Sequence, residues 1–125
     1  MQTYALIMKR RPLAEGIGMT LEEKGGAGIL IIGDYSLALG YMEKYRPGVA
    51  LIEAAESGPF GADYCIKLAA SIKADYPSCR LLLMVPEYDE AAVRTAIDGR
   101  RSGTIDDLVF FDAGLGYIAS KLISM

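Results

Sequence analysis

Five short runs of apolar residues recur along the chain at nearly regular intervals. They lie at residues 4–8, 29–32, 49–52, 81–85 and 108–111. These runs lack the alternation of polar and apolar positions that is typical of a strand with one face in water. They therefore predict strands buried on both faces, as in a parallel sheet.

The segments between the runs have the spacing of amphipathic helices. The expected core stripes are Leu13, Ile17 and Leu21; Leu37, Tyr41 and Tyr45; Cys65, Leu68, Ala69, Ile72 and Tyr76; Val93, Ala96 and Ile97; and Leu115, Ile118, Leu122 and Met125. The first helix is expected to begin at Pro12 and to end at Gly25-Gly26, and the second to follow Ser36 and end by Pro47. The third is expected to end before Pro77, the fourth to run from Asp89 to Gly99, and the fifth to begin at about Ala113.

Strict alternation of strands and helices predicts the α/β class. We expect one domain over residues 1–125, built as a three-layer α/β/α sandwich around a doubly wound, five-stranded parallel sheet. Ligands of such sheets bind at the carboxyl ends of the strands, so the residues that follow each run are the candidates for function.

Composition removes several classes of chemistry. The 125 residues include 13 Lys and Arg, 16 Asp and Glu, and no His. The missing imidazole excludes Ser-His-Asp and Cys-His catalysis and histidine metal sites, and the net charge of −3 argues against direct binding of nucleic acid. No Gly-rich loop of the nucleotide-binding type follows a strand, and no serine has a neighbouring base.

The expected location is the cytoplasm. The apolar runs are too short for a membrane span, and the first residues lack the features of a signal peptide. Cys65 and Cys79 are expected to be buried thiols, with a disulfide left open. The tyrosines at 41, 45, 64 and 76 are expected to pack with their hydroxyls at the rim.

The order of residues resembles the receiver domain of two-component response regulators, most closely the LuxR-type, NarL-like regulators. The similarity covers nearly the whole chain. The segment YALIMKRRPLAEGIGMTLEE is similar to the family's first strand and helix, and RPGVALIEAAESGPFG is similar to its third strand and the loop that follows. The segment LLLMVPEYDEAAVRTAIDG is similar to the fourth strand and helix, and DLVFFDAG to the end of the fifth strand.

The resemblance implies a CheY/flavodoxin-like sheet of order 2-1-3-4-5 and an acidic pocket that binds Mg²⁺ and accepts a phosphoryl group on an aspartate. In this chain every key position departs from that pattern. Lys9 and Arg10 replace the acidic pair, Glu53 the acceptor, Val85 the switch hydroxyl, Phe111 the lysine and Leu108 the switch aromatic.

Charge decides what these replacements do to the pocket. A unit charge about 4 Å from a dication contributes roughly 8 kcal/mol at an effective dielectric constant of 20, attractive for a carboxylate and repulsive for an ammonium group. Two bases in place of two acids reverse that sign. We therefore expect no Mg²⁺ or other cofactor, no catalytic residue, no phosphorylation at Glu53 and no enzymatic activity.

Three interpretations of Glu53 stay open at this point. It pairs with Lys9 or Arg10 as a structural latch, it mimics a permanently switched state, or the two bases bind a small anion. The segment from Gly99 to Asp107 is longer than the family norm. Its Arg100, Arg101, Asp106 and Asp107 predict a solvated loop or charge pairing across a two-fold axis.

The function expected from the resemblance is a pseudo-receiver in phosphorelay signalling. It would act independently of phosphorylation as a regulatory or dimerisation module and control transcription through an output domain beyond residue 125 or through a partner. The protein partner or second copy would bind at helix 4, strand 5 and helix 5. The alternatives are a small-anion or metabolite sensor and an active phosphoacceptor receiver.

Overall fold

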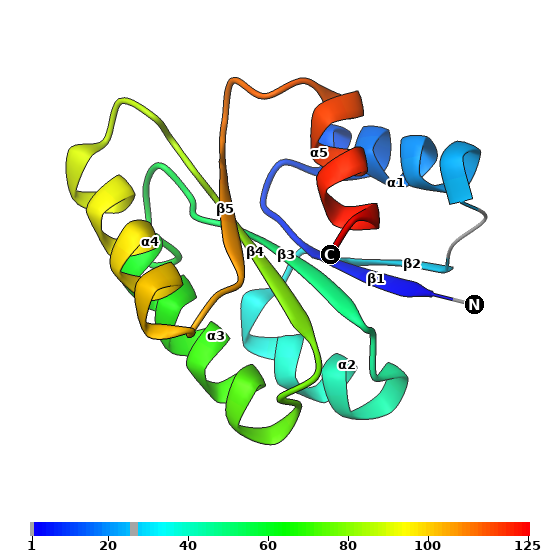
Figure 1. The fold of residues 1–125 in the computed structure, drawn as a ribbon, viewed down its shortest axis with the longest axis horizontal. Helices are drawn as coiled ribbons and strands as arrows, with labels where there is room; N and C mark the ends of the chain where they lie inside the picture. Colours follow the sequence, from blue (N-terminus) through cyan, green and yellow to red (C-terminus); the bar gives the residue numbers. More distant parts are fainter. Residues whose placement is uncertain (1, 26–27) are drawn as a thin grey trace.

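Five parallel strands form one sheet in the order β2-β1-β3-β4-β5 (Figure 1). The computed structural model describes residues 2–25 and 28–125. The elements are β1 (Thr3–Ile7), α1 (Arg11–Gly25), β2 (Gly28–Ile32), the 3-10 turn η1 (Tyr35–Leu37), α2 (Ala38–Tyr45), β3 (Val49–Glu53), α3 (Ala62–Asp75), β4 (Arg80–Val85), α4 (Glu90–Ser102), β5 (Asp107–Phe110) and α5 (Leu115–Ile123). The predicted fold class and strand order are confirmed.

The sheet is the middle layer of the sandwich. Helices α1 and α5 cover one face, and α2, α3 and α4 cover the other (Figure 1). Alternate residues of the central strands supply the two cores. Leu6 and Leu51 belong to the first, while Ile7 and Ile52 belong to the second.

Strand register brings the candidate residues to one edge of the sheet. Ile7 is paired with both Ile32 and Ile52, and Glu53 is paired with Met84. The chain therefore leaves β1, β3, β4 and β5 on the same side of the molecule, and the residues that follow these strands lie close together.

The predicted core stripe of α2 is wrong. Leu37, Tyr41 and Tyr45 are exposed, and the buried residues of this helix are Ala38 and Met42. The preceding turn η1 buries Tyr35 and fixes the rotation of the helix. The face that looks most apolar in the sequence consequently points outward.

The predicted end of α4 is also wrong. The helix continues through Gly99, and Gly103 ends it with a φ of 82°, a left-handed conformation that glycine adopts without strain. Gly99 is buried, and a Cβ atom there would lie 2.6 Å from Cδ1 of Ile66. Arg100 and Arg101 thus belong to the last helical turn and not to a loop.

The remaining differences are smaller. Helix α5 begins at Leu115, two residues after the predicted start at about Ala113, and Leu115 is exposed. Asp89 caps α4 as predicted, through a 3.1 Å hydrogen bond from the Ala92 N–H. Gly26, half of the glycine pair expected to end α1, lies outside the described residues.

Both cysteines are free and buried, which settles the open question of a disulfide. Burial raises the pKa of Cys65 to about 12, and Glu53 adds to this shift. Burial likewise raises the pKa of Cys79 to about 11 against the opposing effect of Lys73. Neither thiol forms a thiolate near neutral pH, so neither is a reactive nucleophile.

Asp106, just before β5, and Asp107, its first residue, form ion pairs within the chain. Their charges are therefore balanced without the pairing across a two-fold axis that the sequence left open. Asp106 accepts hydrogen bonds from Lys73 Nζ and the Leu81 N–H, both at 2.7 Å, and lies 3.3 Å from Arg80. Asp107 pairs with Arg100 and Lys121, and this pairing raises the pKa of the lysine.

The Asp106 carboxylate joins α3 to β4. Its burial favours the neutral form, but the bonds from Lys73 and Leu81 outweigh that effect and hold the pKa of Asp106 below its usual value. A carboxyl group with a lowered pKa stabilises the fold above its ordinary pKa, and this stabilisation is lost as the pH falls through the lowered value.

No helix in residues 2–25 and 28–125 is both long enough and apolar enough to cross a lipid bilayer.

Asp106→Asn should reduce the free energy of unfolding by about 1–2 kcal/mol at pH 7, because Lys73 and Arg80 lose their anion. The difference from wild type should begin to shrink below about pH 4, where the unfolded chain takes up the proton, and should disappear as the pH falls through the lowered pKa of Asp106 in the fold. Urea unfolding at pH 7 and pH 3 measures both effects. Asp98→Asn, at an exposed α4 position, is the control and should change stability by only a few tenths of a kcal/mol. A pH-independent difference for Asp106→Asn would contradict this account.

Candidate functional site

The strand ends surround a cavity of about 310 Å³. Its lining residues are Lys9, Arg10, Glu53, Ala55, Glu56, Ser57 and Phe111. Four of these are positions that the sequence analysis selected: Lys9, Arg10, Glu53 and Phe111. The structure therefore brings the main candidate residues together at the carboxyl end of the sheet.

Glu53 is the centre of the site. It is the last residue of β3, it is only 1% exposed, and it is the one buried charged side chain among the described residues. Its Oε1 accepts hydrogen bonds from the backbone N–H of Lys9 at 2.7 Å and of Arg10 at 3.1 Å. Its Oε2 accepts from Nε of Arg10 in an ion pair. Both carboxylate oxygens are thus occupied by the turn that follows β1.

Arg10 is held on its other side by Phe111. The guanidinium carbon lies 4.2 Å from the centre of the Phe111 ring, and Nη2 lies 3.7 Å from the sulfur of Met84. A planar guanidinium group binds an aromatic face and a carboxylate at the same time, which an ammonium group does less well. Phe111 is therefore an aromatic surface against which the Arg10 guanidinium group packs.

The backbone N–H of Lys9 donates to Glu53, but its ammonium group lies elsewhere. Its Nζ lies 4.9 Å from the centre of the Phe60 ring and 6.0 Å from that of Tyr35. The two adjacent bases therefore diverge. Of the two pairings that the sequence left open, the side chain of Arg10 makes the ion pair.

An aromatic cluster fixes the backbone of Glu53 from the opposite side. Tyr35 and Phe60 are stacked with ring centres 4.7 Å apart, and Tyr64 meets Phe60 edge to face at 4.9 Å. The Tyr35 hydroxyl donates to the Glu53 carbonyl oxygen at 2.5 Å. Burial, reinforced by Cys65 and Glu53, raises the pKa of Tyr35, so the phenol keeps its proton.

Sequence reasoning missed Tyr35 and Phe60. A signal for both was present. Tyr35 follows the β2 run and Phe60 follows the β3 run, so both belong to the edge where parallel strands end. Neither is polar in the usual sense of a site residue, and only the three-dimensional arrangement shows the contact with Glu53.

Val85 and Leu108 do not line the cavity. Val85 is fully buried at the end of β4, and Leu108 of β5 is partly buried against the same apolar cluster. Both residues are therefore part of the apolar core and not of the cavity wall. The side chains at these positions have no group that could bind a phosphoryl oxygen.

The residues around the cavity do not fit a magnesium ion. Mg²⁺ requires several oxygen ligands in near-octahedral geometry. Both oxygens of Glu53 are engaged, a guanidinium group lies beside them, and residues 2–25 and 28–125 contain no cluster of three potential metal ligands.

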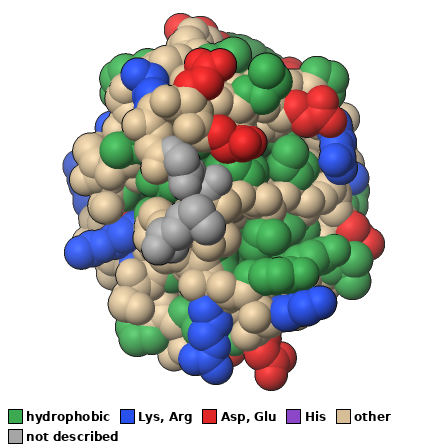
Figure 2. Space-filling model, turned by 90° about the vertical axis from the view of Figure 1, so that its right-hand side faces the viewer, with side chains coloured by type: hydrophobic (Ala, Val, Ile, Leu, Met, Phe, Trp, Pro, Cys, Tyr) green, Lys and Arg blue, Asp and Glu red, His purple; other side chains and the backbone are tan. Residues whose placement is uncertain are grey.

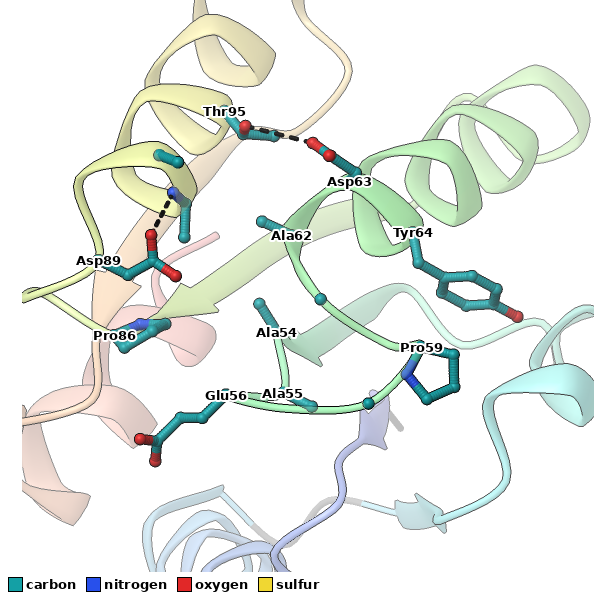
Figure 3. Close-up of a pocket in the computed structure, with 14 residues that line it drawn as sticks. Ala54, Ala55, Glu56, Pro59, Ala62, Asp63, Tyr64, Pro86, Asp89 and Thr95 are labelled. Carbon is teal, nitrogen blue, oxygen red and sulfur yellow. Dashed lines mark hydrogen bonds between the residues drawn. The ribbon is translucent and has the colours of Figure 1, made fainter.

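A second hollow of about 420 Å³ lies between the β3–α3 loop and the first turns of α3 and α4 (Figure 3). Its carboxylates already have partners within the chain. Asp89 caps α4, Thr95 lies 3.4 Å from Asp63, and Tyr88 donates to Glu56. We assign no ligand to this hollow.

Comparison with known proteins identifies the fold. No protein-family model matches the sequence, and no curated protein matches it either. Solved structures do match. A DNA-binding response regulator of the LuxR family from Staphylococcus aureus has a TM-score of 0.79 at 12% identity, covering 99% of this chain and 98% of that chain.

Two further solved structures match nearly the whole chain. The signal receiver domain of a signal transduction histidine kinase from Syntrophus aciditrophicus has a TM-score of 0.80 at 16% identity, covering 99% of this chain and 89% of that chain. An adenylate cyclase from Rhodopirellula baltica has a TM-score of 0.82 at 14% identity, covering 98% and 85%. The chain therefore has the receiver-domain fold, as its sequence predicts, and identities this low show the fold alone.

Arg10→Met should lower the free energy of unfolding by about 1–3 kcal/mol, because it leaves the buried Glu53 carboxylate without its cation. Adding Glu53→Gln to Arg10→Met should recover part of the loss, since a neutral amide oxygen still accepts both backbone N–H groups. In the wild-type background the same Glu53→Gln change should be destabilising, because its amide N–H₂ would face the Arg10 donor. Urea unfolding of the four proteins gives the coupling between the two residues. Strictly additive effects would show that the pair does not form.

Proposed function

We propose that this chain is a receiver-type signalling domain that works without phosphorylation. It would serve two-component signalling in the cytoplasm as a regulatory or dimerisation module, and control transcription through an output domain or a partner. The observation that carries this proposal is the occupation of both Glu53 oxygens by Arg10 and by the backbone of the β1–α1 turn.

Phosphoryl transfer needs features that this arrangement does not offer. The acceptor oxygen must be free to attack, and cations must neutralise the charge that develops on the transferred group. Here the carboxylate is engaged in an ion pair, and the side chain is one methylene longer than aspartate. The longer side chain displaces the oxygen by about 1 Å, and such a misplacement costs about a hundredfold in rate. These features support a domain that is neither a phosphoacceptor nor an enzyme.

The latch interpretation of Glu53 is favoured over a standing mimic of phosphorylation. A phosphoryl group in this fold would reach toward the end of β4, where Val85 is apolar and packed in the core, and Leu108 of β5 packs against the same core. Glu53 instead bonds to the turn after β1. Its charge is used to fix that turn.

A protein partner or second copy at α4, β5 and α5 is the proposed output. Phe110 and Tyr117 are 38% and 59% exposed on this surface, beside a hollow of about 540 Å³. Exposed aromatic side chains are frequent anchors of protein interfaces. Asp107 and its two cations stand beside them and can orient a charged partner.

The anion-sensor alternative loses one of its two proposed ligands. Arg10 is neutralised by Glu53, and Lys9 lies against aromatic rings beside an exposed Glu56. Inorganic phosphate should therefore leave the melting temperature unchanged relative to sodium chloride of equal ionic strength. A phosphate-specific rise, abolished by Lys9→Gln, would restore the anion-sensor function, since a ligand at 100 times its Kd adds about 2.7 kcal/mol.

Incubation with Mg²⁺ and acetyl phosphate should leave the intact mass of the protein unchanged. We expect this result because both oxygens of the Glu53 carboxylate are engaged and the residues around the cavity do not fit a magnesium ion. A competent receiver domain in the same tube is the positive control and should gain one phosphoryl group by mass spectrometry. A phosphoryl adduct on the wild type that disappears in Glu53→Gln would overturn the proposed function.

A further inference from the structure

The two edges of the sheet differ in how they meet water. At one edge, β5 carries Asp107, whose carboxylate bonds to the Leu108 N–H at 2.8 Å and pairs with Arg100 and Lys121. At the other edge, β2 has the sequence GILII and no charged residue. Natural proteins usually shield an edge strand with charges, proline or a bulge. The β2 edge has none of these devices.

Hydrogen bonds show which backbone groups of β2 are free. The Gly28 N–H donates to the carbonyl of Gln2 at 3.0 Å, and the Ile32 carbonyl accepts from the Met8 N–H at 3.1 Å. Successive residues of a strand direct these groups to opposite edges. Gly28, Leu30 and Ile32 therefore face β1, and the N–H and C=O groups of Ile29 and Ile31 face outward.

We propose that this free edge of β2 pairs with β2 of a second copy of the chain, antiparallel, about a two-fold axis at Leu30. This register places Ile29 opposite Ile31 of the other copy. Both residues of such a pair exchange N–H and C=O bonds, so all four outward groups of each strand find partners. Leu30 meets its own counterpart on the axis, in the position where side chains lie closest.

Neighbouring apolar residues enlarge the contact. Leu30 is partly exposed on the face of the sheet that α2 covers. The segment after β2 exposes Leu37 at the end of η1 and Tyr41 and Tyr45 on α2. The two tyrosine rings stack with centres 6.1 Å apart. Figure 2 shows the right-hand side of Figure 1, where several hydrophobic side chains lie at the surface beside Lys and Arg. A five-residue strand pair is small against the roughly 1,200 Å² of a stable interface, so Leu37, Tyr41 and Tyr45 are part of the proposed contact.

The symmetry of the edge favours a second copy over an unrelated extended peptide. One register satisfies both strands at once, and the facing side chains are identical apolar residues with no charge to oppose their own counterparts. The interface is separate from α4, β5 and α5, which it leaves free for a different partner. It does not depend on the state of Glu53, so it stands or falls independently of the proposed function.

The first test uses disulfide formation at the axis. In this register the Cα atoms of residue 30 in the two copies lie about 4.5 Å apart, within the range that a disulfide spans. Leu30→Cys should therefore form a covalent dimer under a mild oxidant. Ile31→Cys is the matched control, because its two copies would lie about 8 Å apart and should stay uncrosslinked. Equal crosslinking of both variants, or none of Leu30→Cys, would overturn the register.

The second test uses the reversible assembly. Sedimentation velocity of the wild type should show a concentration-dependent dimer, and Leu30→Lys should weaken association by about tenfold or more, because two ammonium groups would meet on the axis. Tyr88→Lys, at an exposed position in the loop before α4, is the matched control and should dimerise like the wild type. Phe110→Lys alters the surface of α4, β5 and α5 and reports on any dimer formed there. A circular dichroism melt confirms that each variant is folded. A wild type that is monomeric at every concentration, or a dimer lost in Phe110→Lys and kept in Leu30→Lys, would refute the proposal.

Discussion

The Glu53 carboxylate governs how the functional end of this molecule is built. A buried, ionised group is tolerated only where hydrogen bonds and an opposite charge compensate for the lost water. All three compensating donors come from Lys9 and Arg10, the two residues that connect β1 to α1. The carboxylate thus ties the end of β3 to the beginning of α1. Phe111, in the turn directly after β5, completes the arrangement because its ring packs against the guanidinium group.

The residues around Glu53 depend on one another. Arg10 and Glu53 neutralise each other in a partly buried ion pair. A lysine in place of Phe111 would bring a second cation toward Arg10 and compete for the same carboxylate. The aromatic cluster of Tyr35 and Phe60 holds the main chain of Glu53 from behind, and Lys9 rests against it. Changing one member alone would leave a charge or a polar group without its partner.

The sequence predicts the sheet well because its strands differ sharply from their surroundings. Apolar runs identify all five strands to within about a residue at each end, and their alternation with helices defines the layers. The sequence could not show in the same way which face of α2 is buried. Spacing shows that Leu37, Tyr41 and Tyr45 share a face, but not that this face meets the core. Burial of Tyr35 in the preceding turn sets the rotation, and that is a tertiary effect. The predicted end of α4 at Gly99 was wrong for a related reason. A glycine in a helical pattern is compatible with a helix end and also with close packing inside a helix, and the sequence does not distinguish the two.

At the site, the sequence identified the opposed charges but not their geometry. Lys9 and Arg10 are adjacent and equally charged, and only the contact of the guanidinium group with Phe111 decides which of them pairs with Glu53. The same limit applies to surfaces. An apolar run predicts a strand whether it lies in the centre of a sheet or at its edge, and only the strand order reveals that GILII is an edge. Once that order is known, the contrast with the charged β5 edge has physical meaning. One edge is protected from pairing with another strand, and the other has an uncharged backbone whose outward groups are self-complementary.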